Sequence, residues 1–199
     1  MKTACFVLML LLTQGVYAQK DTSNVLNVSD LGDRMQISLG DSVIEFTYEE
    51  MYYYYLEKGV ELANEADFQT AISYFELSLL YLTTDAQAWY NLGLCYYNLE
   101  AYEEAVLNFD QAVSLDPAFS EAYNQRAICK ALQGNYEASL PDFQKAIDLN
   151  PGVGMNYHNK AVAHLQLGET NLACDLLHQA LSLGYENSAH LIEEYCSAD

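Results

Sequence analysis

The sequence predicts an all-α protein, an α-solenoid of four helix-turn-helix units that ends in a C-terminal capping helix. The first observation behind this prediction is a period of 34 residues, the interval that separates Trp89, Tyr123 and Tyr157. The second is the scarcity of helix breakers, with 3 prolines and 10 glycines among 199 residues. Self-similarity at a fixed interval of this size is typical of stacked repeats.

The period defines four units, at 52–85, 86–119, 120–153 and 154–187, within a repeat region at 47–187. Matching positions hold the same kind of residue, as in Tyr102 and Tyr136, Phe109 and Phe143, Pro117 and Pro151, and Ala112, Ala146 and Ala180. Each unit reads as two amphipathic helices. One unit cannot bury its apolar surface alone, so stacking between neighbours must supply the core.

The second unit matches a known repeat pattern, W-x2-L-G-x2-Y, then A-x3-F, then P. The matching residues are Trp89, Leu92, Gly93, Tyr96, Ala105, Phe109, Ala112 and Pro117. The chain therefore resembles the tetratricopeptide repeat (TPR) family, over four units of 34 residues. The resemblance implies a scaffold that binds proteins or peptides, and it implies that the first helix of each unit lines a concave groove.

Three residues depart from an ordinary repeat. Arg126 and Lys160 stand where the second unit has Leu92, and we expect their stems to pack while their charged ends reach acids such as Asp142. Pro141 falls inside an expected helix, where we expect a kink or a later helix start.

The first 18 residues predict a secretory signal peptide, with Lys2, a short apolar run from Ala4 to Leu12, and cleavage after Ala18. The alternative is a membrane anchor, but a membrane span needs roughly 20 apolar residues. We therefore expect an exported protein with no membrane insertion after cleavage.

The other end of the chain, residues 188–199, predicts the capping helix, with Leu191, Ile192 and Tyr195 facing inward. The run before and through it resembles the C-terminal end of bacterial envelope TPR proteins. This resemblance implies the periplasm or cell envelope of a Gram-negative bacterium, with secretion as the alternative.

Residues 19–46 form an N-terminal arm outside the repeats. The polar segment from Gln19 to Asp30 is expected to be mobile. Residues 35–39 and 43–46, on either side of Gly40 and Asp41, predict a small β-hairpin that packs on the first repeat, pairs with another chain or stays loose. Thr47 and Glu50 predict a capping box at the start of the first helix.

Four cysteines remain after signal cleavage. Cys95 and Cys129 occupy the same place in adjacent units, where stacked helices hold them too far apart for a disulfide, so we expect buried thiols. Cys174 and Cys196 are separated by one helical hairpin, and the sequence leaves open whether they are bonded. With His178 and His190 they also suggest a metal site, but the spacing is unlike known zinc patterns, and we expect no metal and no cofactor.

Composition excludes several classes of function. The formal net charge is −20, from 8 basic and 28 acidic residues, which repels nucleic acids and anionic membranes. No Walker loop, dinucleotide fingerprint, HExxH motif or nucleophile elbow is present. We therefore expect no enzymatic activity.

The TPR resemblance implies an apolar, tyrosine-rich groove that suits an apolar peptide or helix. Its expected partner-binding residues are Tyr53, Leu56, Val60, Tyr90, Leu94, Tyr97, Asn98, Asn124, Ile128, Leu132, His158, Val162 and Leu165. The alternative for each of them is ordinary packing between repeats.

Family members that grip a C-terminal carboxylate use a basic clamp of Lys, Arg and Asn. Here Asn91 matches one clamp position, while Leu56, Val60, Glu121 and Gln125 stand at the others. This ligand class is therefore disfavoured.

Three functions remain open at this point. The first is an exported scaffold that holds a partner protein in its groove. The second is a structural subunit of an envelope assembly, or a protein that self-associates through the arm or a capping face. The third is a groove that is filled and regulated by the chain's own arm.

Overall fold

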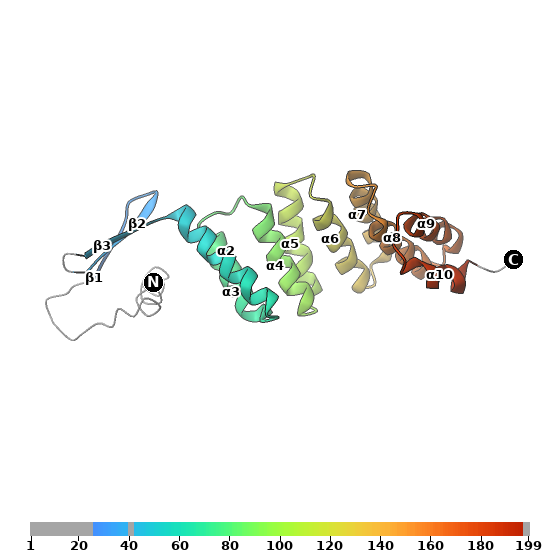
Figure 1. The fold of residues 1–199 in the computed structure, drawn as a ribbon, viewed down its shortest axis with the longest axis horizontal. Helices are drawn as coiled ribbons and strands as arrows, with labels where there is room; N and C mark the ends of the chain where they lie inside the picture. The colour runs from blue at the N-terminus through green and yellow to red at the C-terminus, as the bar shows by residue number, and fades with distance from the viewer. Residues whose placement is uncertain (1–25, 40–41, 197–199) are drawn as a thin grey trace.

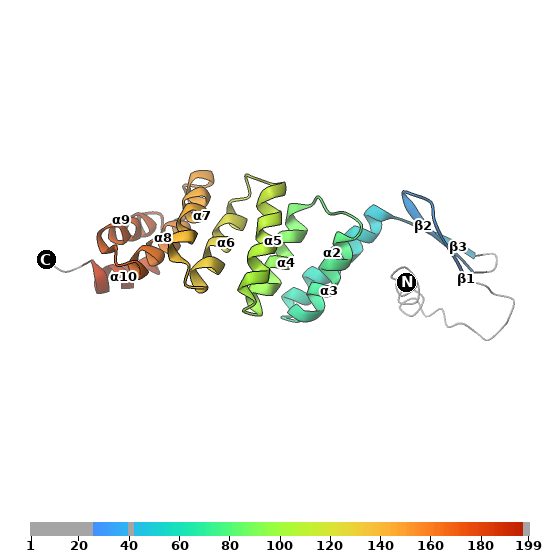
Figure 2. The same cartoon turned by 180° about the vertical axis from the view of Figure 1, so that it is seen from behind.

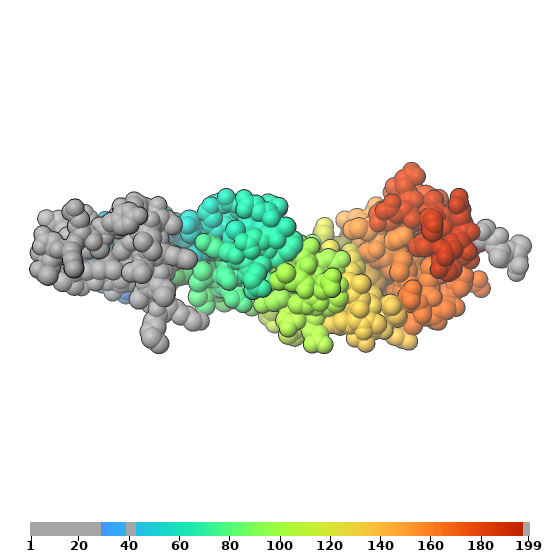
Figure 3. All heavy atoms as spheres, turned by 90° about the horizontal axis from the view of Figure 1, so that it is seen from below, coloured from blue at the N-terminus to red at the C-terminus, as the bar shows by residue number. Residues whose placement is uncertain are grey.

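The computed structural model describes residues 26–39 and 42–196, and the expected signal peptide lies outside them. The described chain is elongated, with a small sheet at one end and the C-terminal helix at the other (Figure 1). Helices that are consecutive in the sequence lie side by side from both directions of view (Figure 2). In the space-filling view the described residues follow one another along the long axis (Figure 3).

Eight helices form four antiparallel pairs, and a ninth ends the described chain. The pairs are α2 (Tyr48–Asn64) with α3 (Phe68–Leu79), α4 (Ala86–Asn98) with α5 (Tyr102–Leu115), α6 (Ser120–Leu132) with α7 (Tyr136–Leu149), and α8 (Gly154–Gln166) with α9 (Thr170–Ser182); α10 is Ser188–Tyr195. The predicted solenoid of four units with a capping helix is confirmed. None of these helices is both long and apolar enough to cross a membrane.

The two layers of the solenoid differ in how they contact their neighbours. The first helices of successive units contact one another, α2 with α4, α4 with α6, and α6 with α8. The second helices contact mainly their own partner and the first helix of the next unit. The first helices therefore form the inner, concave side, which we call the inner face, and α3, α5, α7 and α9 form the outer layer.

The turn inside each pair uses a left-handed residue at the same repeat position. These residues are Ala66 (φ 63°), Glu100 (φ 60°), Gly134 (φ 80°) and Gly168 (φ 75°). Only glycine adopts this conformation without steric cost, so the first two turns store strain that the last two avoid.

Small residues and aromatic rings make the core. Phe75, Phe109 and Phe143 are at most 1% exposed and stand at one repeat position. Gly59 and Gly93 leave room for the first two of these rings. Cys95 and Cys129 are buried free thiols, as expected from their positions.

Residues 26–47 form a three-stranded antiparallel sheet in the order β1-β2-β3, with β1 at Leu26–Asp30, β2 at Arg34–Leu39 and β3 at Ser42–Thr47. The predicted hairpin corresponds to β2 and β3, and its turn at 40–41 lies outside the described residues. The expectation that Gln19 to Asp30 is mobile is wrong for Leu26–Asp30, because these residues pair with β2 along their whole length.

The sheet packs on the first repeat. Met35 is 4% exposed and forms one buried cluster with Met51 and Tyr55 of α2. The hydroxyl of Tyr48 donates a hydrogen bond to the Asp30 carboxylate, 2.6 Å away. Thr47 and Glu50 form the predicted capping box, so the strand leads directly into α2.

Two further expectations are corrected. Tyr195 does not face inward, because it is 44% exposed, whereas Leu191 and Ile192 pack against Leu177. Pro141 does not delay its helix, since α7 begins at Tyr136 and runs through it.

Candidate functional site: the inner face

The inner face combines exposed groove residues with residues that serve inter-repeat packing. Tyr53, Val60, Asn98 and Leu132 are exposed, with Leu132 at 51%. Most of the others are partly buried: Leu56, Tyr90, Leu94, Tyr97, Ile128, His158, Val162 and Leu165. Asn124 is only 3% exposed, accepts a hydrogen bond from Asn159 and lines a small cavity between the first helices of the second, third and fourth units.

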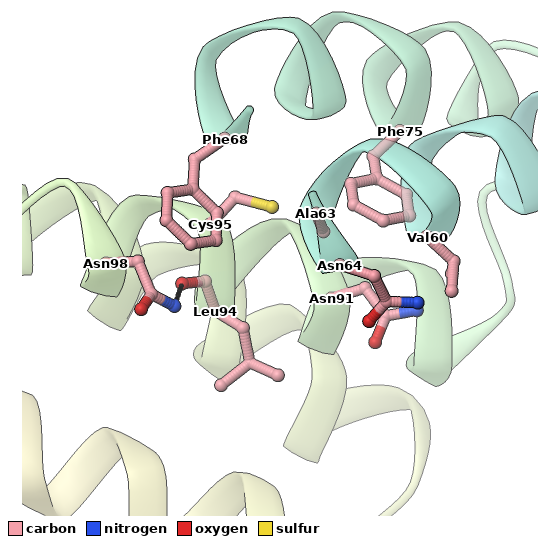
Figure 4. A pocket seen from close by; sticks show the side chains of 9 residues that line it. All are labelled: Val60, Ala63, Asn64, Phe68, Phe75, Asn91, Leu94, Cys95 and Asn98. Carbon is pink, nitrogen blue, oxygen red and sulfur yellow. Dashed lines mark hydrogen bonds between the residues drawn. The ribbon is translucent and has the colours of Figure 1, made fainter. Parts of the chain in front are cut away.

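An apolar hollow of about 220 Å³ lies between the first two units. Its residues are Val60, Ala63 and Asn64 of α2, Phe68 and Phe75 of α3, and Asn91, Leu94, Cys95 and Asn98 of α4. In Figure 4 the rings of Phe68 and Phe75 lie on one side and the three asparagine amides on the other. Because Phe75 is buried whereas Asn64 and Asn98 are exposed, the rings form the floor and the amides form the rim.

A second hollow, of about 290 Å³, lies between the last two units. It is lined by Ile128, Ala131, Leu132, Tyr136, Phe143, Asn159, Val162, Ala163 and Gln166. Each of these nine residues lies 68 residues, or two repeats, after its counterpart in the first hollow. The two hollows are thus the same feature of the repeat at two places, and neither is lined by a charged side chain.

Tyr97 occupies the corresponding place between the second and third units. It stands one repeat after Ala63 and one repeat before Ala131. Its ring lies 6.1 Å from the ring of Tyr102, and both pack against the buried cluster of Phe109 and Cys129. The side chain therefore takes the space that alanine leaves open in the two hollows.

A column of side-chain amides runs along the inner face at one repeat position, formed by Asn91, Gln125 and Asn159. The Oδ1 of Asn91 accepts from Gln87, and the Nδ2 of Asn159 donates to Asn124. In the described part of the chain, the Gln125 Oε1 is a buried oxygen without a hydrogen-bond partner. Glu57 stands one repeat before Asn91, so an acid precedes this amide column.

A third, smaller cavity of about 120 Å³ contains Gln125 together with Tyr90, Glu121 and Met155. The ring of Tyr90 lies 4.8 Å from that of Phe119. Burial, and secondly the Glu121 carboxylate, raise the pKa of Tyr90. Tyr90 is thus a neutral packing residue of this interface.

A partly buried ion cluster joins the second and third units. The sequence predicted its contact between Arg126 and Asp142 but not its other members. Arg126 donates from Nε to Asp142, at 2.8 Å, and from Nη1 to Asp110, at 2.6 Å. Lys130 also reaches Asp142, at 2.7 Å. Lys160 instead donates to Gln144. Of the two cations expected to reach Asp142, only Arg126 does so. Lys130 stands one helical turn after Arg126 on α6, whereas Asp110 comes from α5 of the preceding unit.

The C-terminal end of the inner face is tied to α10. The Nδ1 of His158 lies 3.0 Å from the Ser188 hydroxyl, and the histidine ring packs on Tyr185. Burial lowers the pKa of His158. Cys174 and Cys196 form a disulfide that links α9 to the end of α10. Within residues 26–39 and 42–196, no group of three or more His, Cys, Asp or Glu side chains is arranged to hold a metal ion.

None of the lining residues of the two hollows comes from the arm. Its described part, 26–39 and 42–46, packs on α2 at the end of the solenoid instead. The inner face therefore remains open along the residues that the structure describes.

The tetratricopeptide repeat family model matches residues 86–119 and 120–153. No curated protein matches the chain in sequence.

Several solved structures share the fold. A crystal structure of MamA is 19% identical, with a TM-score of 0.66, covering 71% of this chain and 87% of that one. MamA from Desulfovibrio magneticus RS-1, from residue 41 to its end, is 18% identical with a TM-score of 0.64, covering 67% and 76%. The second TPR domain of human RPAP3, in complex with the HSP70 peptide SGPTIEEVD, is 21% identical with a TM-score of 0.57, covering 58% and 97%. At these identities the likeness establishes the fold alone.

Proposed function

Because this chain is a tetratricopeptide repeat protein, we propose that it is a non-catalytic scaffold that binds an apolar peptide segment of a partner protein on its inner face. The observation that carries this proposal is the pair of equivalent apolar hollows, with their aromatic floors and uncharged linings. Apolar pockets with a few polar groups at the rim are the usual form of a binding site.

The ligand differs from a C-terminal carboxylate. The RPAP3 domain is solved with an HSP70 peptide that ends in Asp. In this chain the corresponding clamp positions include Leu56, Val60 and Glu121, which offer no cation. An anionic chain end would therefore meet no positive partner here and would meet the repulsion of a net charge of −20.

The titratable groups near the hollows support a non-catalytic role. Burial raises the pKa of the Cys95 thiol to about 11 and that of the Cys129 thiol to about 12. Both thiols stay protonated at neutral pH, and a thiol is a weak nucleophile in that form.

The proposed location is outside the cytoplasm, in the periplasm or envelope of a Gram-negative bacterium, with secretion as the alternative. The first 18 residues and the Cys174–Cys196 disulfide support export, since disulfides persist in oxidising compartments. The test is the N-terminal sequence and thiol state of the protein isolated from cell fractions. We expect a chain that begins at Gln19 with two of its four cysteines blocked, whereas an intact leader with all five cysteines free in the cytoplasm would contradict export.

Self-association through the sheet is the second candidate. Among the described residues, β1 and β3 each pair only with β2, so both outer edges are open, and Val43 beside them is 55% exposed. An open edge favours pairing with another chain. Light scattering tests this candidate by giving the number of chains in the assembly with and without residues 19–46. The same number in both cases would exclude self-association through the sheet.

The scaffold proposal is tested with a displayed library of random twelve-residue peptides, selected against the full chain. Leu132→Asp places a charge at the rim of the second hollow, and Leu107→Asp places one at a 64% exposed leucine of the outer layer. We expect selected peptides to lose roughly tenfold or more in affinity for Leu132→Asp, because a charge beside a buried apolar contact is costly. Equal affinity for both variants, or loss only in Leu107→Asp, would overturn the inner face as the site.

A further inference from the structure

We propose that the inner face recognises an extended peptide with two apolar anchor residues five or six positions apart, one in each hollow, and that Tyr97 fixes this spacing by closing the place between them. This inference rests on the proposed function and names the ligand of the same site. It follows from the position of the hollows, the filled place between them and the chemistry of their rims.

Each hollow has room for one anchor. An apolar cavity of about 150 Å³ is large enough to hold benzene. The volumes of about 220 and 290 Å³ therefore suit a side chain the size of leucine or phenylalanine. Val60 at the first hollow and Leu132 at the second remain 38% and 51% exposed, so an anchor would cover apolar surface that now meets water.

The distance between the hollows sets the spacing of the anchors. Packed helices lie about 8–10 Å apart, and the hollows are two steps of the inner layer from each other, hence about 16–20 Å. An extended chain advances about 3.3 Å per residue. The two anchors are therefore separated by about five or six residues of an extended segment.

Tyr97 makes this spacing selective. Without its ring, the inner face would carry hollows at three successive interfaces, and anchors about three residues apart would also fit. The ring packs on Tyr102 at that middle interface, whereas Ala63 and Ala131 leave the outer two open. The repeat itself thus shows that a tyrosine is tolerated at this position.

The rims favour an extended backbone over a helix. Asn64, Asn91 and Asn98 border the first hollow, and Asn159 and Gln166 border the second. Side-chain amides offer both a donor and an acceptor, which match the free N–H and C=O groups of an extended peptide. A helix has already used these backbone groups internally.

Charge decides the flanking residues of the ligand. Glu57, at the repeat position of Asn91, and Glu121, in the third cavity, place negative charge on the inner face. No cation lines the two described hollows. Of the six described Lys and Arg residues, Arg34, Lys58, Arg126 and Lys130 are engaged in ion pairs and Lys160 donates to Gln144. With a net charge of −20, the complementary partner is a segment with a net positive charge.

The test uses the peptides selected from the library, measured by fluorescence anisotropy against the full chain and three variants. In each peptide, residues are inserted or deleted between the two apolar positions. We expect the tightest binding at a spacing of five or six, and a loss of roughly tenfold or more when one anchor is replaced by serine.

Two variants close a hollow by copying the native middle interface, Ala63→Tyr and Ala131→Tyr, and each is expected to reduce the affinity to that of a single-anchor peptide. The third variant, Tyr97→Ala, is expected to gain binding of peptides whose anchors are three residues apart. Thermal melts check that each variant is folded. If one variant does not fold, the dependence of wild-type affinity on the anchor spacing still tests the inference.

Different results contradict different parts of the account. Peptides that lose affinity for Leu132→Asp but bind equally well at every anchor spacing would overturn the two-anchor inference and leave the groove intact. Selected peptides that are helical in the complex, or acidic, would overturn the proposed ligand chemistry. Insensitivity to Leu132→Asp would overturn the proposed function itself.

Discussion

Gly154 and Ala180 approach so closely that a Cβ on the glycine would lie 2.8 Å from the Ala180 carbonyl oxygen. The same hypothetical Cβ would lie 2.9 Å from the Cβ of Tyr185. One repeat earlier, Ser120 donates a hydrogen bond to the matching carbonyl of Ala146, at 3.1 Å. In the third and fourth units, the start of the first helix thus contacts the end of the second helix of the same unit.

Gly154→Ala is therefore expected to destabilise the protein by about 1–3 kcal/mol, because the backbone carbonyl cannot move aside cheaply. Gly152→Ala is the matched control, since its Cβ would meet only Asn150, at 3.9 Å. Urea unfolding followed by circular dichroism measures both. Equal stability of the two variants would show that the approach at Gly154 is not tight.

The left-handed turn residues give a stabilising prediction. Ala66→Gly and Glu100→Gly should each raise the free energy of unfolding by up to about 1 kcal/mol, because a side chain at positive φ costs about 1–2 kcal/mol and the added backbone entropy offsets part of the gain. Gly134→Ala, at the matching turn, should have the opposite sign. A loss of stability in both glycine variants would contradict the strain at these turns.

The disulfide is expected to hold the capping helix. Cys174 and Cys196 are 22 residues apart, and Leu191, Ile192 and Cys196 cover the cluster of Ala161 and Leu177. Reduction should lower the unfolding free energy by about 2–4 kcal/mol. The double variant Cys174→Ser/Cys196→Ser serves as the control, since it should have the lower stability already and respond no further to reductant. If reductant lowered the stability of the double variant by the same amount, the effect would not come from the Cys174–Cys196 disulfide.

The buried thiols predict a fall in stability at alkaline pH. The pKa of the thiols is raised from 9.0 to about 11 at Cys95 and about 12 at Cys129. Between about pH 9 and 11 the unfolded chain loses these protons while the folded chain keeps them, so the unfolding free energy falls as the pH rises. The slope over this range should be shallower in Cys95→Ala/Cys129→Ala than in the wild type. The same slope in both would mean that the thiols do not contribute.

The solenoid could be predicted from the sequence because its period repeats one set of core residues, from Phe75 to Phe143. The small features could not. Ala66 and Glu100 carry no local signal for a left-handed turn, and only their alignment with Gly134 and Gly168 points to it. The polar composition around Leu26–Asp30 predicts a mobile segment and hides a short strand that pairing with β2 stabilises.

The inner face was predictable as a surface but not in detail. The repeat positions identify the residues near it, yet they do not separate ligand-facing side chains from packing ones. Asn124 is buried by its contact with Asn159, and Tyr97 fills a place that alanine leaves open elsewhere. Such differences arise from the neighbours of each residue in space. A one-dimensional pattern does not contain them.

The most direct measurement is photo-cross-linking with a selected peptide in which one anchor at a time is replaced by a photoreactive leucine. The account predicts that the two anchors label separate sites, one at Val60 and Ala63 and the other at Ala131 and Leu132. Labelling at Leu107 or Leu172 of the outer layer, or at the N-terminal sheet, would contradict it.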